Sequence, residues 1–227
     1  MTQPTLYIIH GWTYTTSHWE ATLAILKEQG IKVVMLNVPG LTTDSKKIFT
    51  IEDYMKWADR NIPDGAIALG HSNGGRILLN LLCQKPEKLK HLILVSAAGV
   101  YEPSRKRDIL RMGSKAFAGL KKVPGVRRVV HKVVGASDYD RAPENMKKTL
   151  TNMLDSDRQL QIENVKVPTT ILWGEQDRVT PPRQAKILHN KITGSELKMY
   201  KNWTHAPYIS HPEDFARAIK VVMESIK

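Results

Sequence analysis

One short segment of the chain carries a serine in a setting that could make it a nucleophile. The segment Gly70-His71-Ser72-Asn73-Gly74 has the pattern Gly-x-Ser-x-Gly, preceded by an apolar run at residues 66–69 and followed by an apolar helix pattern at residues 74–84. This arrangement predicts a sharp strand–turn–helix elbow with the serine at its tip. A serine hydroxyl is a weak nucleophile at neutral pH and needs a base to take its proton. The pattern therefore predicts covalent catalysis by Ser72, and its alternative is an ordinary glycine-rich turn between a strand and a helix.

Two later turns offer an acid and a histidine. Trp173-Gly174-Glu175-Gln176-Asp177 follows an apolar strand pattern, and Trp203-Thr204-His205-Ala206-Pro207 follows another. Together with the serine elbow, these motifs resemble the α/β-hydrolase superfamily, specifically its lidded members with a serine nucleophile. The resemblance covers the chain from His10 to the last helix, and it implies a catalytic triad in the chain order Ser72, Asp177, His205.

Each member of such a triad has a defined task. His205 would accept the proton of Ser72 and later donate it to the leaving group, and Asp177 would fix the tautomer of His205 and stabilise its imidazolium form. Glu175 is a competing acid in the same turn, although carboxylates on exposed turns are usually only solvated. Some family members place the acid after an earlier strand, but here that segment, residues 95–99, holds no carboxylate before Glu102. We therefore favour Asp177.

A tetrahedral intermediate also needs backbone N–H groups aimed at its oxygen. The amide of Asn73, directly after the nucleophile and at a helix N-terminus, is one candidate. The resemblance implies that the amide of Trp12 is the other and that His10 orients its loop. The family often has a glycine-rich stretch here, whereas this chain has Gly11 only. The Trp12 side chain would then narrow the acyl pocket, form a wall, or simply pack in the core, and we expect His71 to pack beneath the elbow.

Other site chemistries have little support in the sequence. A single cysteine, Cys83, and the lack of a Cys/His or His-Glu-x-x-His cluster argue against a zinc site. No glycine-rich phosphate loop follows the first strand pattern, so a nucleotide has no expected binding site. A serine instead of an aspartate at the nucleophile position disfavours the dehalogenase and epoxide hydrolase branches of the resemblance. We expect neither a cofactor nor a metal.

Strand and helix patterns alternate along most of the chain. Strands are predicted at residues 6–9, 33–36, 66–69, 92–95, 169–173 and 197–200, and helices at residues 18–29, 51–61, 74–84, 182–190 and 212–225. Most strand patterns are continuously apolar, which is typical of parallel strands covered on both faces. This alternation predicts an α/β fold with a doubly wound, mostly parallel sheet of about six strands. The first two strands of the family's full sheet are then missing.

Residues 103–161 break the alternation because they hold helix patterns without a convincing strand. A connection of this length is far longer than an ordinary crossover. We interpret it as a helical lid inserted into an α/β-hydrolase core that comprises residues 1–102 and 162–227. Four aromatic residues could line a hydrophobic substrate site or belong to the core: Trp12, Tyr101, Tyr139 and Trp203.

The net charge of +12 is concentrated in this insertion. Residues 103–135 contain ten basic residues and one acidic residue, a net charge of +9. A basic block confined to one segment does not make the whole protein a nucleic-acid-binding protein, so no nucleic acid is expected. The block is either the solvated face of the lid helices or a contact for anionic membrane or an acidic substrate.

The length of 227 residues fits one domain with an insertion, and 41% hydrophobic and 25% charged residues exclude disorder, collagen and coiled coil. No apolar run has the roughly 18 residues of a membrane span. Residues 1–4 do not begin a signal peptide, and one cysteine fits a reducing compartment, so we expect a cytoplasmic protein.

These features predict a serine hydrolase of the carboxylesterase type (EC 3.1.1) that cleaves a small-molecule ester through an acyl-enzyme. Hydrolysis of a carbon–carbon bond, a thioester or an amide uses the same triad and stays open. A further alternative is a non-catalytic member of the fold that binds a small molecule or a partner. The identity of the substrate, its acyl chain length and the oligomeric state do not follow from these motifs.

Overall fold

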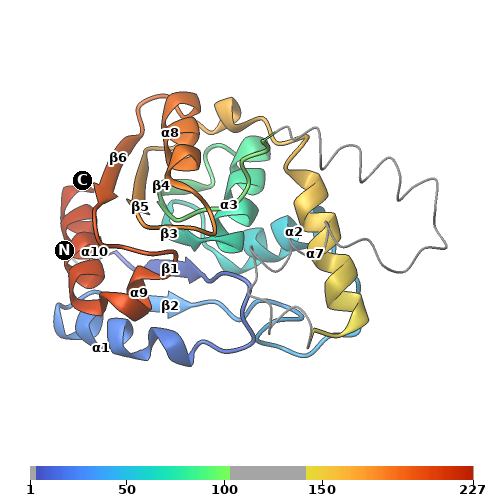
Figure 1. Ribbon diagram of the computed structural model, residues 1–227, viewed down its shortest axis with the longest axis horizontal. Coiled ribbons are helices and arrows are strands. Elements are labelled where there is room, and N and C mark those ends of the chain that lie inside the picture. The colour runs from blue at the N-terminus through green and yellow to red at the C-terminus, as the bar shows by residue number, and fades with distance from the viewer. Residues whose placement is uncertain (1–3, 103–141, 227) are drawn as a thin grey trace.

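The computed structural model describes residues 4–102 and 142–226 of the chain. Six strands form one sheet in the order β2-β1-β3-β4-β5-β6, and every neighbouring pair is parallel (Figure 1). The strands are β1 (Leu6–Ile9), β2 (Val33–Met35), β3 (Ala66–His71), β4 (Leu89–Val95), β5 (Thr169–Gly174) and β6 (Glu196–Tyr200). The predicted fold class, a doubly wound parallel α/β sheet of about six strands, is confirmed.

Helices cover both faces of the sheet. On one face, α1 (Glu20–Glu28) and α10 (Pro212–Ser225) enclose one apolar cluster, and on the other face a second cluster lies under α2 (Ile51–Asn61), α3 (Asn73–Gln84) and α8 (Pro182–Lys191). Successive strand residues point to opposite faces, so along β4 Leu92 and Leu94 join the second cluster while Ile93 and Val95 join the first. Among the described residues, no helix combines the length and apolar character that a membrane span requires.

Short elements complete the described part of the fold. They are the 3-10 turns η1 (Ser17–Trp19) and η2 (Ile162–Asn164) and the four-residue helix α9 (Pro207–Ser210). Helix α2 begins at the predicted residue, Ile51. Thr50 and Asp53 form a reciprocal capping box there, in which the Thr50 amide donates to the Asp53 carboxylate at 3.0 Å.

Part of the expected lid is described, and it is helical. Helix α7 (Glu144–Ser156) lies beside α2 in Figure 1 and buries Met146, Leu150 and Met153 in the same cluster as α2 and α3. The hydroxyl of Thr149 accepts a hydrogen bond from the Phe49 amide at 2.9 Å, which ties α7 to the loop before α2. The basic block of residues 103–135 and Tyr139 lie outside the described residues, so the lid and its boundaries stay a prediction.

The strand order places a topological switch point at the carboxyl ends of β1 and β3. The chain runs from β1 to β2 on one side and then crosses to β3 on the other side of β1. Loops that leave the carboxyl ends of two strands at such a switch point diverge, and ligands bind between them. Here the loop after β1 begins with Gly11 and Trp12, and the turn after β3 carries Ser72.

Candidate active site

Ser72 occupies a strained turn between β3 and α3. Its backbone angles are φ 50° and ψ −116°, a region that residues with a side chain rarely adopt. The surrounding structure holds this conformation: the Ser72 amide donates to the Val95 carbonyl at 3.1 Å, and the Ser72 carbonyl accepts from the amides of Gly75 at 3.0 Å and Ala98 at 2.9 Å. Strain that is held in place in this way clusters at functional sites.

The glycines of the elbow are required by close approach. A Cβ atom on Gly74 would lie 2.1 Å from the carbonyl oxygen of Ile9, and one on Gly70 would lie 2.6 Å from the backbone of α3. The loop after β1 is also close, because a Cβ atom on Gly11 would lie 2.9 Å from His71 Nδ1 and 3.1 Å from the Cβ atom of Ser72. Glycine at these positions therefore lets the β1 loop and α3 converge on the serine.

Asp177 and His205 form a hydrogen-bonded pair at the same edge of the sheet, after β5 and β6. His205 Nδ1 donates to Asp177 Oδ2 at 2.9 Å, and the side chains are 19% and 0% exposed. The other carboxylate oxygen, Oδ1, accepts from the amides of Val179 at 2.8 Å and Thr180 at 2.9 Å. The Thr180 hydroxyl donates to Oδ2 at 2.8 Å.

These donors decide the protonation of the pair. Burial by itself raises the pKa of Asp177, but hydrogen bonds from His205, Thr180 and the Val179 amide together hold that pKa below its usual value. An ionised carboxylate only accepts hydrogen bonds, so His205 carries its proton on Nδ1. The Nε2 atom of His205 is then the ring nitrogen that can take a proton from another group.

His71, the residue before the serine, packs beneath the elbow as expected. Its Nε2 donates to the backbone carbonyl of His205 at 2.9 Å, and the two imidazole rings lie 5.0 Å apart. Burial, reinforced by the neighbouring His205, lowers the pKa of His71 to about 3. His71 is therefore neutral at physiological pH, and it ties the His205 loop directly to the serine turn.

Two backbone amides near the elbow have no partner. Neither the Trp12 amide nor the Asn73 amide has a hydrogen-bond acceptor within residues 4–102 and 142–226. The Trp12 loop is held by His10, whose Nδ1 donates to the Gly11 carbonyl at 2.8 Å and whose Nε2 accepts from the Thr42 hydroxyl at 3.2 Å. Burial lowers the pKa of His10, which keeps it in this neutral form. Backbone amides without an acceptor are what an oxyanion requires.

The aromatic residues considered for substrate contact have different environments. Trp12 is buried and belongs to the cluster under α2 and α3. Trp203 is buried on the opposite face, where it stacks on Tyr200 at 3.6 Å between ring centroids and belongs to the core beneath α10. Tyr101 is half-buried, with the Arg158 guanidinium 4.9 Å from its ring centroid. Tyr139 lies outside the described residues.

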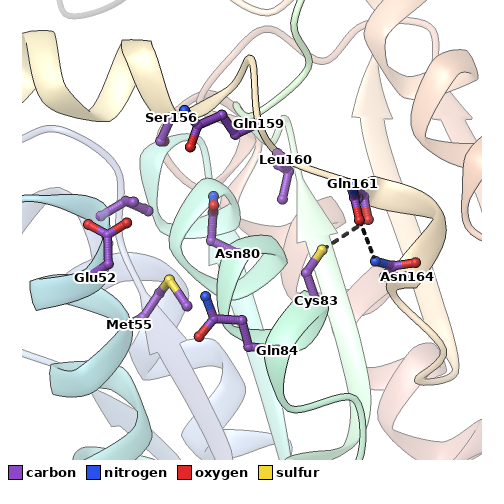
Figure 2. A pocket seen from close by; sticks show the side chains of 11 residues that line it. Glu52, Met55, Asn80, Cys83, Gln84, Ser156, Gln159, Leu160, Gln161 and Asn164 are labelled. Atoms are coloured by element: carbon purple, nitrogen blue, oxygen red, sulfur yellow. Dashed lines mark hydrogen bonds between the residues drawn. The ribbon is translucent and has the colours of Figure 1, made fainter.

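Two cavities can be compared as sites for chemistry. One is formed by the turn after β5 and the loop after β6 and includes Asp177 and His205. The other, of about 230 Å³, lies between α2, α3 and the stretch after α7 (Figure 2). Its Cys83 thiol donates to the Gln161 carbonyl at 3.1 Å, and burial raises the pKa of Cys83 to about 11, so this thiol is protonated and a poor nucleophile. The acid and base candidates, Asp177 and His205, therefore line the first cavity, whereas Ser72 lines neither of the two.

Sequence reasoning missed Thr180. Its hydroxyl lies 2.8 Å from Asp177 Oδ2, 3.2 Å from His205 Nδ1 and 3.1 Å from the Ser96 carbonyl. A usable signal was present, because a hydroxyl residue three positions after an acid commonly shares local side-chain–backbone bonds with it. Within the described ranges, no three His, Cys, Asp or Glu side chains come close enough together to hold a metal ion.

Comparisons with known proteins bear on the family and the fold of the chain. A sequence profile of the alpha/beta hydrolase fold family matches residues 4–212. The chain is similar to the pimeloyl-[acyl-carrier protein] methyl ester esterase of Aromatoleum aromaticum, with 25% identity over 98% of this chain and 99% of that protein. The enzyme of the same name from Neisseria meningitidis serogroup C is 24% identical over 97% and 94%. A solved monoacylglycerol lipase from Paleococcus ferrophilus shares the fold, with a TM-score of 0.70, 19% identity and coverage of 100% of this chain and 96% of that one.

Proposed function

The chain belongs to the alpha/beta hydrolase fold family, and we propose that it is a serine hydrolase that cleaves a carboxylic ester through an acyl-enzyme, as carboxylesterases of the EC 3.1.1 type do. One observation carries the proposal. A strained serine and a hydrogen-bonded acid–histidine pair share one edge of the sheet, linked by the 2.9 Å bond from His71 to the His205 backbone. The ester hydrolases among its relatives support the same reaction class.

In the first half of the proposed reaction, Ser72 forms the acyl-enzyme. The Ser72 hydroxyl attacks the ester carbonyl carbon while its proton passes to Nε2 of His205. The carbonyl oxygen becomes an oxyanion that accepts hydrogen bonds from the amides of Trp12 and Asn73. The intermediate collapses when the bond to the alcohol oxygen breaks, and the imidazolium of His205 gives its proton to the departing alcohol.

In the second half, water releases the acid. His205 takes a proton from a water molecule, the resulting hydroxide attacks the acyl carbon, and the proton returns to Ser72 Oγ as the acyl bond breaks. The low pKa of Asp177 supports this cycle because the carboxylate stays ionised and stabilises the imidazolium in both halves.

A finer substrate class is favoured by the names of the relatives. Those enzymes act, by name, on a methyl ester attached to an acyl-carrier protein. The net charge of +9 in residues 103–135 would suit contact with an acidic substrate. We therefore propose that the substrate is an ester of a small alcohol whose acyl chain is either acidic itself or attached to a carrier protein. The kcat/KM for such a substrate should fall as salt is added, whereas that for a neutral aryl ester should not.

Covalent labelling tests the proposed mechanism directly. A fluorophosphonate probe should label Ser72 stoichiometrically, as read by intact mass and peptide mapping, and aryl esters of increasing chain length should be hydrolysed. Ser72→Ala and His205→Ala should each lose several orders of magnitude in kcat while keeping the fold. Labelling without ester turnover would redirect the search to carbon–carbon, thioester or amide substrates. Folded protein that neither labels nor turns over would favour a binding member of the fold.

A further inference from the structure

The elbow helix carries a buried arginine that the mechanism above does not use. Arg76, in the first turn of α3, is 2% exposed. Its guanidinium forms a bidentate ion pair with Asp157, with Nε to Oδ1 at 2.7 Å and Nη2 to Oδ2 at 2.9 Å. The third nitrogen, Nη1, donates to the side-chain oxygen of Asn73. One buried cation thus links the residue after the serine to a carboxylate far along the chain.

The Asn73 end of this link lies at the proposed oxyanion site. The backbone N–H of Asn73 is a candidate oxyanion donor, and its position depends on how the first residue of α3 is held. Asn73 is 4% exposed and its side chain is bonded to Arg76. A side chain anchored in this way restrains the Cα atom and the amide attached to it. Misplacing an oxyanion donor by a fraction of an ångström weakens its contribution to catalysis.

The Asp157 end lies where residues 103–161 return to the core. Asp157 follows α7 directly, and its side chain is 11% exposed. Its neighbours Ser156, Gln159 and Leu160 line the cavity of about 230 Å³ over α3 (Figure 2). Because a cavity lies behind this stretch, close packing does not hold it fully against α3. The ion pair with Arg76 and the hydrogen bond from the Cys83 thiol to the Gln161 carbonyl both attach this stretch to α3.

Stability alone is a poor explanation for Arg76. A cation in the first turn of a helix opposes the helix dipole. Burying a charge pair costs desolvation energy, and apolar replacements of such pairs are often as stable or more stable. The geometry of the group, with three directed hydrogen bonds that end on Asn73 and Asp157, fits a role in positioning better than a role in stabilising the core.

We propose that Arg76 is a positioning residue for the oxyanion site: it fixes the Asn73 amide, and its bidentate pair with Asp157 holds the guanidinium in place for that task. This inference rests on the proposed serine hydrolase function. It predicts that loss of Arg76 weakens stabilisation of the transition state more than binding of the substrate.

Lys88 provides a matched control. It is also a buried cation, 7% exposed, and it is paired with Asp64 at 2.6 Å and Asp59 at 3.2 Å. It lies just before β4, at the edge of the sheet opposite the elbow. Lys88→Met therefore removes a buried cation and its two ion pairs, whose carboxylates are more exposed than that of Asp157, without touching the proposed site.

The experiment compares Arg76→Met, Asn73→Ala, their double variant and Lys88→Met on an aryl ester. Removing a whole oxyanion donor costs about 10²–10³ in kcat, so a misplaced donor should cost about 10–100-fold. We expect that loss in kcat for Arg76→Met with KM within about threefold of wild type. The Ki of a trifluoromethyl ketone, whose adduct presents an oxyanion, should rise by a similar factor. Asn73→Ala should show a similar defect, and the double variant should be no worse than the more impaired single variant.

The outcomes separate this inference from the function on which it rests. Wild-type protein that neither labels at Ser72 nor turns over esters would defeat the proposed function itself. With active wild type, an Arg76→Met variant whose kcat and Ki match those of Lys88→Met would overturn the positioning role. If Arg76→Met does not fold, Arg76→Lys and Asn73→Ala test the positioning role in its place. Arg76→Lys keeps the charge but not the bidentate geometry, so wild-type kcat in both folded variants would equally overturn the inference.

Discussion

Replacing Asp177 with asparagine should reverse one hydrogen bond in the site and stop catalysis. In the native protein Oδ1 accepts from the amides of Val179 and Thr180, and Oδ2 accepts from His205 Nδ1 at 2.9 Å and from the Thr180 hydroxyl. The asparagine oxygen can take the place of Oδ1 and keep both amide bonds. Its NH₂ group then faces His205, and because NH₂ only donates, Nδ1 must become the acceptor. The ring proton of His205 moves to Nε2.

The size of the effect follows from that tautomer. His205 with a proton on Nε2 cannot take the proton of Ser72, so the general base is lost while the fold remains. The same substitution in a well-studied triad lowers kcat about 10⁴-fold for this reason. At about 1.36 kcal/mol per factor of ten, that is about 5.5 kcal/mol of transition-state stabilisation. We expect kcat/KM of Asp177→Asn to fall by about three to four orders of magnitude.

The assay is aryl ester hydrolysis at neutral pH, with thermal unfolding to show that each variant is folded. Glu175→Gln is the control, because it makes the same carboxylate-to-amide change on an exposed residue of the same turn. It should stay within about twofold of wild type, as expected of a surface substitution. Folded Asp177→Asn that keeps more than a tenth of the wild-type kcat/KM would refute the tautomer argument. If instead Glu175→Gln lost most of the wild-type kcat/KM, Glu175 rather than Asp177 would be the acid of the triad.

Further predictions concern three residues of the elbow and, for comparison, one glycine outside it. Ser72→Gly, relieved of the strain at φ 50°, should gain about 1 kcal/mol in urea unfolding while losing activity, and Ser72→Ala should lose activity without that gain. Gly74→Ala should fail to fold, or lose at least about 3 kcal/mol, because its Cβ would lie 2.1 Å from the Ile9 carbonyl oxygen. Gly194→Ala, at φ +76° with nothing within 4 Å, should cost only about 1–2 kcal/mol. Because burial lowers the pKa of His71 to about 3, the unfolded chain binds a proton between pH 6.5 and 3 that the native protein does not. The free energy of unfolding should therefore fall as the pH is lowered through that window, by up to about 1.4 kcal/mol per pH unit. A folded His71→Gln variant with an unchanged slope would contradict this assignment.

Much of the fold could be predicted from local sequence patterns. Strand β1 and helices α2 and α10 have the predicted bounds, because buried strands are continuously apolar and helix starts carry capping residues or proline. Strand β4 begins at Leu89, earlier than predicted, because Lys90 and His91 interrupt its apolar pattern. The patterns do not predict helix α9, since its four residues, Pro207–Ser210, are too few to show a helical period.

The candidate site was less accessible to sequence reasoning than the fold. The types and order of the reactive residues could be read from motifs, but their supports come from contacts over long separations. Arg76 and Asp157 are 81 residues apart, and nothing local in either segment indicates their pairing. Whether an aromatic residue lines a site or the core depends in the same way on distant packing, and Trp203 is buried against α10. Motifs therefore predict the chemistry, and only the fold supplies the positions.

The two imidazoles beside the elbow have opposite electrostatic demands in the proposed mechanism. His205 must become positively charged when it takes the proton of Ser72. The carboxylate of Asp177, which is hydrogen-bonded to His205, stabilises that positive charge. A second imidazolium 5.0 Å away on His71 would oppose that charge by about 3 kcal/mol at an effective dielectric constant of about 20. That repulsion would slow acylation by more than about a hundredfold. Burial prevents it by holding the pKa of His71 at about 3. The same burial lowers the free energy of unfolding in acid. The loss of stability at low pH is therefore a consequence of keeping His71 neutral beside His205, the proposed catalytic base.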